Sequence, residues 1–475
     1  MEHIPCLIGG DELVLEDTFE NIDPSTGQPV AVVSRGGRDE IDAAVGAAAQ
    51  AFAATRKLGP QWRSQVMMGL ARLIRLNGDR LAALESRDVG KPISQARADV
   101  EATAKYFEFY ASALVSLHGD TLPQAEGMVA FTRREPFGVT GHITPWNYPL
   151  QMTARTLAPA LAAGNCTVLK PAEDTPSTAV EIGRLALEAG FHPGMINVVN
   201  GLGVEAGAAL SSHRGVSHLS FTGSRPVGTA IAKAAAENVI PVVLELGGKS
   251  PNLVFGDADL DVAVPLIVNA ITQNAGQTCS AGSRVLVHSS VHAELVERVA
   301  TAFTAMRVGR AHTDPDIGAI INRKQRDRIA AMVSRVDSSR IVTGGVIPDD
   351  PDLAGGYFYR PTLLDNIDPS SEMGQDEVFG PVLAVTPFDD EREAVELANG
   401  TEYGLVAAVW TRDVGRAHRV AEDVIAGQIF INTYGAAGGV DLPFGGWKGS
   451  GYGREKGVEG LLGYTQTKTI AVGTR

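Results

Sequence analysis

Short apolar runs alternate with helical segments along the middle of the chain. Runs that predict buried strands occur at residues 138–143, 166–169, 195–199, 216–221 and 240–244. Segments with helical spacing lie between them, at residues 150–163, 176–190, 203–211 and 225–236. This alternation predicts parallel βαβ units in a doubly wound sheet, where ligands bind at the carboxyl ends of the strands.

A second alternation follows the first. It comprises a strand at 252–255, a helix at 259–273, a strand at 283–288 and a helix at 291–306, so we expect a second α/β domain beginning near residue 247. Further helices are predicted at 39–56, 62–76 and 93–115. Residues 445–453 read as a loop, and residues 464–473 alternate like an edge or intersubunit strand.

Composition narrows the class of protein. Hydrophobic residues make up 44% and charged residues 20% of 475 residues, which is typical of globular proteins. The net charge of −14 argues against a nucleic-acid or anionic-membrane partner, since both require basic surfaces. A small anionic ligand held locally is not excluded.

The cysteines and the N-terminal residues indicate the cellular compartment in which we expect the protein. Three cysteines at scattered positions do not form a disulfide framework and fit a reducing compartment. We find no basic region followed by an apolar run at the N-terminus, and no apolar stretch long enough for a membrane helix. We therefore expect a cytoplasmic protein. Because no HExxH or zinc-spaced cysteine pair is present, we expect no metal site.

One cysteine lies in an unusual segment. Cys279 ends the stretch N-A-G-Q-T-C and is followed by Ser-Ala-Gly. A structural cysteine is normally surrounded by apolar residues, whereas a reactive thiolate needs access and nearby dipoles or charges. The small polar neighbours favour a reactive role, although a lone cysteine is a weak signal. Cys6 and Cys166 are interpreted as structural.

Two polar stretches follow predicted strands. P-W-N-Y-P-L at 145–150 presents Asn147, an amide donor for a developing oxyanion or simply a turn residue. K-P-A-E at 170–173 presents Lys170 and Glu173, which either flank a ribose or form a solvated turn. An acid that binds the ribose hydroxyls disfavours a 2′-phosphate, so NAD is favoured over NADP.

Two glycine-containing stretches complete the set. In F-T-G-S-R-P-V-G at 221–228, Gly223 and Ser224 precede a helix whose N-terminal amides could hold a pyrophosphate, or they merely shape the turn. E-L-G-G-K-S at 245–250 places Glu245 at the end of an apolar run, where it is either a carboxylate beside a helix without a special role or a desolvated group, whose pKa would be raised toward that of a general base.

Taken together, these stretches resemble the NAD(P)-dependent aldehyde dehydrogenases. The resemblance extends from about residue 15 to 472 and includes E-V-F-G-P at 377–381 and P-F-G-G at 443–446. Its most specific feature is the spacing of Glu245 and Cys279. The implied fold is a Rossmann-like cofactor domain, an α/β catalytic domain and a small β oligomerisation arm.

The resemblance implies catalytic roles. Cys279 would attack the aldehyde to form a thiohemiacetal and then a thioester, with Asn147 and the Cys279 N–H holding the oxyanion. Glu245 would activate the water that hydrolyses the thioester, and acylating relatives generally lack this acid. Glu455 resembles a second carboxylate near the water path. Residues expected at the cofactor are Ile143, Thr144, Pro145, Trp146, Lys170, Glu173, Gly223, Ser224, Leu246, Gly247, Glu377 and Phe379.

The sequence departs from the family pattern near the substrate. Many relatives have a lysine at the position of Thr156, and its absence puts a proton relay through Glu455 in doubt. Arg155 resembles an arginine that binds the substrate carboxylate in succinic semialdehyde dehydrogenases, but their second arginine is replaced here by Gln273. Semialdehydes, aromatic aldehydes and longer aliphatic aldehydes all remain open. The expected substrate residues are Tyr148, Arg155, Thr278 and Phe444, with Phe109 and residues 434–442 nearby.

The resemblance also divides the chain. It implies a cofactor domain at 1–117 and 137–246, a catalytic domain at 247–448, an arm at 118–136 and 464–475, and a return segment at 449–463. The terminal strand would extend a partner's sheet, giving a homodimer or homotetramer. The alternatives are an acylating or esterase-type enzyme that uses the same cysteine, and a non-catalytic structural descendant. Retention of Cys279, Glu245 and Asn147 argues against the descendant.

Overall fold

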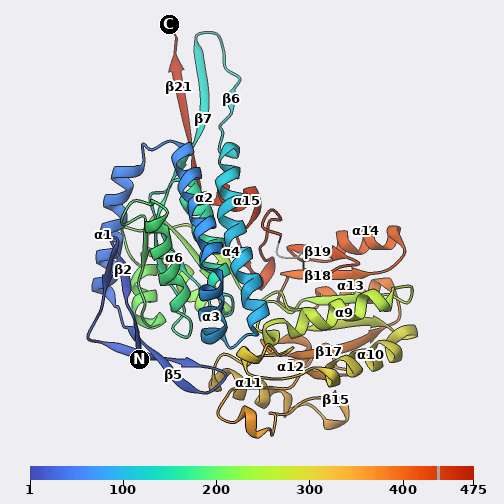
Figure 1. Ribbon diagram of the computed structural model, residues 1–475. Helices are drawn as coiled ribbons and strands as arrows, with labels where there is room; N and C mark the ends of the chain where they lie inside the picture. Colours follow the sequence, from blue (N-terminus) through green and yellow to red (C-terminus); the bar gives the residue numbers. More distant parts are fainter. Residues whose placement is uncertain (436–438, 475) are drawn as a thin grey trace.

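The computed structural model describes residues 1–435 and 439–474, and it contains two large mixed sheets (Figure 1). In the first sheet the strand order is β20-β12-β11-β8-β9-β10-β2-β3. Its central strands run parallel and comprise β8 (Val139–Ile143), β9 (Cys166–Lys170), β10 (Ile196–Val198), β11 (His218–Thr222) and β12 (Val242–Glu245). The shorter strands β2 (Cys6–Ile8), β3 (Asp11–Leu13) and β20 (Gly451–Tyr452) add antiparallel edges.

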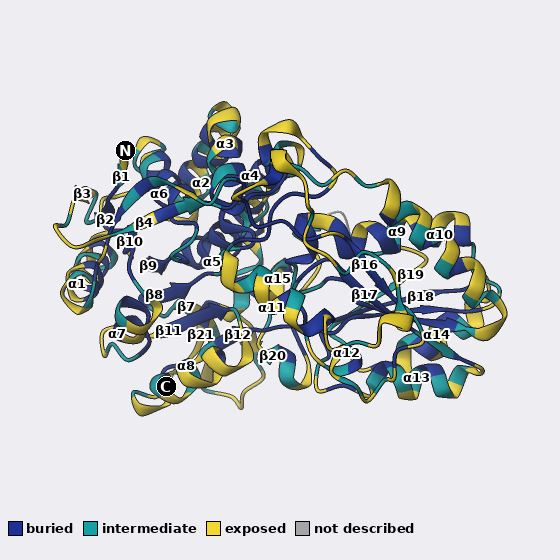
Figure 2. Cartoon of the chain, turned by 90° about the horizontal axis from the view of Figure 1, so that it is seen from below, coloured by how far each residue is buried: buried dark blue, intermediate teal, exposed yellow. Residues whose placement is uncertain are grey.

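Helices cover both faces of the first sheet, which explains why β8, β9 and β11 are buried along their whole length. One face carries α1 (Arg38–Thr55), α7 (Ala208–Ser211) and α8 (Arg225–Glu237). The other carries α5 (Pro149–Ala163) and α6 (Ser177–Glu188). A further layer packs on α5 and α6, and it consists of α2 (Pro60–Leu76), α3 (Gly78–Val89) and α4 (Ile93–Ala113). Figure 2 shows the sheet as a buried layer beneath partly exposed helices.

The second sheet has the order β15-β16-β17-β14-β13-β18-β19. Its strands are β13 (Pro251–Val254), β14 (Arg284–His288), β15 (Ile341–Thr343), β16 (Thr362–Leu364), β17 (Val382–Phe388), β18 (Val406–Trp410) and β19 (Gln428–Ile431). Helices α9 (Leu260–Thr272) and α10 (His292–Ala305) pack into one apolar cluster with this sheet. Helices α13 (Glu391–Asn399) and α14 (Val414–Asp423) pack into a second cluster on the sheet.

A narrow three-stranded sheet projects from the body and carries the C-terminus near its tip (Figure 1). Here β21 (Thr465–Gly473) pairs antiparallel with β7 (Met128–Pro136), which also pairs with β6 (Thr121–Leu122). The segments that the sequence predicted to share an arm therefore form one sheet. A fourth small sheet joins β1 (Glu2–Ile4), β4 (Thr18–Asp23) and β5 (Gln28–Ser34).

The remaining elements are short or lie in the second half of the chain. They are α11 (Arg323–Val333), α12 (Glu372–Gln375), α15 (Gly457–Gly463), the 3-10 turns at 114–116, 273–276, 289–291, 311–313, 338–340, 351–353 and 448–450, and a π-helical turn at 203–207. In the described ranges, no helix combines the length and apolar character needed to cross a bilayer.

The structure corrects two sequence-based expectations. Residues 445–453, predicted to be a loop, contain a 3-10 turn and strand β20, because Gly451 and Tyr452 pair with the end of β12. Residues 203–211, predicted to be one helix, divide into a π-helical turn and the short helix α7. Alternation of apolar residues is too brief in both segments to reveal these structures.

The arm leaves one edge of β21 without a partner strand among the described residues, so it can pair with another subunit. We predict that deleting residues 466–475 lowers the mass of the particle in solution, because the edge strand is removed. Light scattering after size-exclusion chromatography measures that mass, and circular dichroism checks that the shortened chain is folded. An unchanged mass would contradict a role of the arm in assembly.

Candidate active site

Four of the predicted site residues lie at, or just after, the carboxyl ends of parallel strands. Asn147 follows β8, Lys170 ends β9, Ser224 follows β11, and Glu245 ends β12. Because these strands run parallel in one sheet, their ends meet at one edge. Residues far apart in sequence are thereby brought to one side of the molecule.

Cys279 is held by a strained turn that follows α9. Asn274 and Ala275 have φ values of 49° and 53°, and Gly276 has a φ of 73°, so three successive residues are left-handed. A side chain at Gly276 would lie 2.2 Å from the carbonyl oxygen of Gly380, so only glycine fits there. Such strain persists only where surrounding contacts enforce it.

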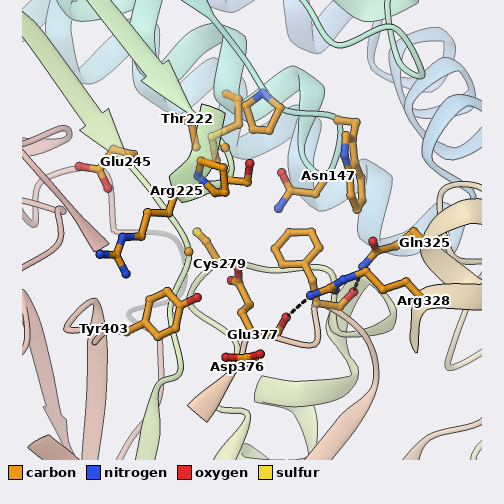
Figure 3. A pocket seen from close by; sticks show the side chains of 18 residues that line it. Asn147, Thr222, Arg225, Glu245, Cys279, Gln325, Arg328, Asp376, Glu377 and Tyr403 are labelled. Atoms are coloured by element: carbon orange, nitrogen blue, oxygen red, sulfur yellow. Dashed lines mark hydrogen bonds between the residues drawn. The ribbon is translucent and has the colours of Figure 1, made fainter. Parts of the chain in front are cut away.

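Those contacts come from the loop that contains Asn147. The Asn274 Nδ2 group donates to the Asn147 carbonyl at 2.8 Å, and Asn147 Nδ2 donates to the Gln277 carbonyl at 2.8 Å. Tyr148 Oη and Thr278 Oγ1 lie 2.9 Å apart in a third bond between the two loops. Asn147 is 4% exposed and its amide has a second N–H, which is available to a ligand in the cavity shared with Cys279 (Figure 3).

A cavity of about 520 Å³ extends from Cys279 toward the N-terminus of α8. It is lined by Pro145, Trp146, Asn147, Met152, Thr222, Gly223, Ser224, Arg225, Pro226, Glu245, Gly247, Cys279, Gln325, Arg328, Asp376, Glu377, Phe379 and Tyr403. Its residues fit a dinucleotide, because the first turn of α8 offers amides to a pyrophosphate and the Ser224 side chain makes no capping bond there.

The loop at 377–379 is positioned by α11. Arg328 donates to the carbonyls of Glu377 at 2.9 Å and Val378 at 2.8 Å, and Gln325 donates to that of Phe379 at 3.0 Å. Phe379, with a φ of 56°, meets Trp146 edge to face with ring centroids 5.2 Å apart. Glu377 accepts from Gly248 N at 3.1 Å, and burial raises its pKa to about 7.

Glu245 is buried, and no donor among the described residues forms a hydrogen bond to its carboxylate. Its side chain is 2% exposed, and within the described residues neither carboxylate oxygen accepts a hydrogen bond. Burial raises its pKa well above the ordinary value, although the charge of Arg155 acts in the opposite direction. A carboxylate of raised pKa with free lone pairs is suited to take a proton from water.

Arg155 joins the two predicted catalytic carboxylates. Its Nη2 lies 3.6 Å from Oε2 of Glu245, and its Nε forms an ion pair with Glu455. Glu455 is also held by the Ser220 hydroxyl, which donates to Oε1 at 3.1 Å. The guanidinium carbon lies 4.3 Å from the centre of the Phe444 ring. Thr156, which takes the place of the lysine expected from the family resemblance, donates to the Met152 carbonyl within α5.

Burial raises the pKa of the Cys279 thiol to about 11, and the charges of Arg155 and Lys456 partly oppose this effect. Cys279 is nevertheless partly exposed, whereas Cys6 and Cys166 are fully buried, with pKa values raised to about 12 by burial. Cys279 is thus the cysteine that a ligand can reach.

A second cavity of about 440 Å³ also reaches Cys279. All four predicted substrate residues, Tyr148, Arg155, Thr278 and Phe444, line it. Phe109 instead packs against the core of the first sheet. Within residues 434–442, Tyr434, Gly435, Gly439 and Leu442 contribute to the lining, and residues 436–438 lie outside the described residues.

Several predicted cofactor residues are not part of the described lining of the first cavity. They are Ile143, Thr144, Lys170, Glu173 and Leu246. Lys170 Nζ lies 3.2 Å from the Glu173 carboxylate, and Glu173 also accepts from the Gly203 N–H. Lys170 ends β9, the strand next to β8, and Glu173 follows it; the assignment of this pair to the adenosine ribose stays a prediction.

Sequence reasoning missed Gln325, Arg328, Tyr403 and Lys456. The first three lie in segments without a recognisable motif, so only the fold brings them to the cavity. Lys456 did have a signal, because it directly follows Glu455 in G-R-E-K-G. No group of three or more histidine, cysteine or acidic residues suited to a metal occurs in the described parts of the chain.

Comparisons with known proteins agree with this geometry. The profile of the Aldehyde dehydrogenase family matches residues 14–470. Betaine aldehyde dehydrogenase of Bacillus subtilis is 40% identical over 96% of this chain and 94% of its own length. A Burkholderia cenocepacia protein provisionally named an aldehyde dehydrogenase is 51% identical, with a TM-score of 0.96 over 99% of this chain and 100% of that one.

A further solved structure carries a cofactor. Betaine aldehyde dehydrogenase of Staphylococcus aureus in complex with NAD+ is 36% identical, with a TM-score of 0.96 over 99% of this chain and 95% of that one. The chain belongs to the aldehyde dehydrogenase family and is an NAD(P)-dependent oxidoreductase.

Gly247 leaves room for the Glu377 carboxylate, since a Cβ at residue 247 would lie 2.2 Å from its Oε2. We predict that Gly247→Ala displaces Glu377 and weakens NAD+ binding by about tenfold or more, or about 1.4 kcal/mol. Isothermal titration calorimetry measures the dissociation constant. Gly46→Ala is the matched control, because a Cβ there meets nothing within 4 Å. Equal affinity in the two variants would contradict this role of Gly247.

Proposed function

We propose that this enzyme oxidises an aldehyde to a carboxylic acid through a thioester on Cys279 that water hydrolyses. The observation that carries the proposal is the meeting of Cys279, Asn147 and Glu245 around one cavity. Membership in the family supports aldehyde oxidation, and the arrangement of these side chains supports the individual roles.

Attack begins at the sulfur. The Cys279 thiolate adds to the aldehyde carbon, and the positive charges of Arg155 and Lys456 favour this ionised form. The oxygen becomes an anion, which the second N–H of the Asn147 amide and the Cys279 N–H would stabilise. The bonds from residues 274 and 278 to the Asn147 loop keep the sulfur and the amide in fixed relation.

The residues around the first cavity would hold the dinucleotide. Ser224 and the α8 amides would contact its pyrophosphate, and Glu377 its nicotinamide ribose. When bound, NAD+ supplies the acceptor for the hydride that leaves the aldehyde carbon. The charged pair of Lys170 and Glu173 would bind the other ribose, and an acid at that place favours NAD over NADP.

Deacylation needs a water molecule and a base. Glu245 would take one proton from the water while the water oxygen attacks the thioester carbon. The Cys279 thiolate would then leave. The acid has no competing hydrogen bond in the described structure, so its lone pairs can accept from water. Glu455 lies on the other side of the Arg155 guanidinium from Glu245, and because arginine does not give up its proton, a proton would pass between the two carboxylates through water.

The first test is NADH formation at 340 nm without coenzyme A. The aldehydes are succinic semialdehyde, benzaldehyde, hexanal, betaine aldehyde and glyceraldehyde. We expect turnover with at least one of them and none in Cys279→Ala, because the sulfur forms the covalent bond. Turnover only with coenzyme A would favour the acylating alternative. Tight NAD+ binding without turnover under either condition would favour a non-catalytic descendant.

In the proposed reaction Cys279 acts first, in formation of the thioester, and Glu245 acts later, in its hydrolysis. We predict that Glu245→Gln still releases about one equivalent of NADH per site in a burst, while its steady-state kcat falls about 10²- to 10⁴-fold. The reason is that acylation needs only the sulfur, whereas hydrolysis needs the base. Stopped-flow absorbance measures both phases. Loss of the burst together with the steady state would contradict this division of roles.

Arg155 acts on both carboxylates, so its removal should affect every substrate alike. We predict that Arg155→Ala raises the pKa of Glu245 further, because a neighbouring positive charge is lost. A base must be deprotonated to work, so the rising limb of the kcat–pH profile shifts to higher pH. Profiles with hexanal and succinic semialdehyde check this. A loss confined to the semialdehyde would show instead that Arg155 binds its carboxylate.

A further inference from the structure

The second cavity is polar as well as aromatic. Tyr106, Tyr148 and Phe444 contribute rings to its lining, and Gln151, Asn269 and Gln273 contribute amides. Cys279 lies in the lining, so a substrate that reaches the sulfur from this side has its remaining atoms within these walls. The groups on the walls therefore select the substrate.

Most charges on these walls already have a partner. Asp99 accepts from Lys91 at 2.6 Å and from Gln151 at 2.6 Å. Arg155 is paired with Glu245 and Glu455, and it is only 3% exposed. The guanidinium is therefore occupied by the catalytic carboxylates, and a substrate carboxylate would have to compete with them for it.

Lys456 is the exception. Within residues 1–435 and 439–474, its ammonium group makes no ion pair with a carboxylate within 4 Å and no hydrogen bond. Its Nζ lies 5.3 Å from the centre of the Phe444 ring and 6.0 Å from that of Tyr106. Aromatic faces attract a cation but do not neutralise it. The cavity therefore has a positive charge that no described carboxylate contacts directly, although Glu455 and Glu245 act on it from a longer distance.

The backbone at Lys456 is held in an unfavourable conformation. Its φ of 60° and ψ of 170° belong to a region that essentially only glycine adopts. The residue before it is tied to Phe444 by two main-chain hydrogen bonds of 2.7 and 2.8 Å, and Gly457 N donates to the Val440 carbonyl at 2.8 Å. These bonds direct Glu455 to Arg155 and leave the next side chain on the cavity wall.

The surroundings leave Lys456 charged near neutral pH. Burial and the like charge of Arg155 lower its pKa to about 8, while Cys279, Glu455 and Glu245 act in the opposite direction. An ammonium group that is partly desolvated and faces another cation gains most when an anion is placed beside it.

We propose that Lys456 binds a carboxylate at the far end of the substrate, so that this enzyme prefers aldehydes that carry an ω-carboxylate. The inference rests on the proposed function, because it assigns the substrate class to the same Cys279 site. In this proposal the anion is bound by Lys456, and not by Arg155 as the family resemblance suggested. The chemistry of the reaction is unchanged: the effect of the Lys456 charge on the Cys279 thiolate is the same for every aldehyde, whereas binding of the carboxylate adds to it only for aldehydes that carry one.

The test compares two aldehydes of equal chain length, succinic semialdehyde and butanal, by their kcat/KM values at pH 7. We expect the enzyme to favour succinic semialdehyde, and Lys456→Met to lower the ratio of the two values at least tenfold, mainly through KM. Lys456→Arg retains the charge and should restore part of the ratio. Lys105→Met is the matched control, because this exposed lysine on α4 lies outside both cavities.

Two outcomes would overturn the proposal. Equal losses with both aldehydes would show that Lys456 acts only through the Cys279 thiolate, and the absence of a preference for succinic semialdehyde would show that no anion is recognised.

A binding measurement is independent of turnover. In Cys279→Ala saturated with NAD+, calorimetry with succinate and butyrate should show tighter binding of succinate, and the added Lys456→Met change should abolish the difference. Equal affinities for the two acids would overturn the proposal even if the protein proved inactive. If the enzyme turns over no aldehyde but succinate still binds more tightly than butyrate, only the proposed function is contradicted.

Discussion

The reciprocal bonding of two loops is the constraint on which the site depends. One loop follows β8 and contains Asn147, and the other follows α9 and contains Cys279. The Asn274 amide donates to the Asn147 carbonyl, and the Asn147 amide donates to the Gln277 carbonyl, both at 2.8 Å. These bonds sustain three left-handed residues in succession, and they set the sulfur beside an amide that still has a free N–H.

A second constraint is electrostatic. Arg155 lies in the buried α5 and makes ion pairs with both Glu245 and Glu455. Without it, two carboxylates would face each other in a desolvated site, at a high cost in free energy. The arginine thus opposes the rise that burial causes in the pKa of Glu245, the proposed general base. With Arg155 engaged in this way, Lys456 remains as the unpaired cation of the described substrate cavity.

Much of this arrangement could be predicted from the sequence. The alternation after residue 138 indicated the parallel strands, and the end of each strand indicated where Asn147, Lys170, Ser224 and Glu245 would lie, because such ends share one edge. The pairing of Arg155 could not be predicted, since its partners are 90 and 300 residues away along the chain. Arg328 and Gln325 were missed for a related reason: they act through main-chain carbonyls, which leave no pattern in the sequence.

The central claim is that the acyl group is carried by Cys279 between oxidation and hydrolysis. Its most direct test is the mass of the Glu245→Gln protein, quenched in acid after one turnover with NAD+ and an aldehyde substrate, followed by peptide mapping. We expect a mass increase of one acyl group per chain, confined to the peptide that contains Cys279 and absent when NAD+ is omitted. Formation of NADH with an unmodified Cys279 peptide, or acylation at Cys6 or Cys166, would contradict it.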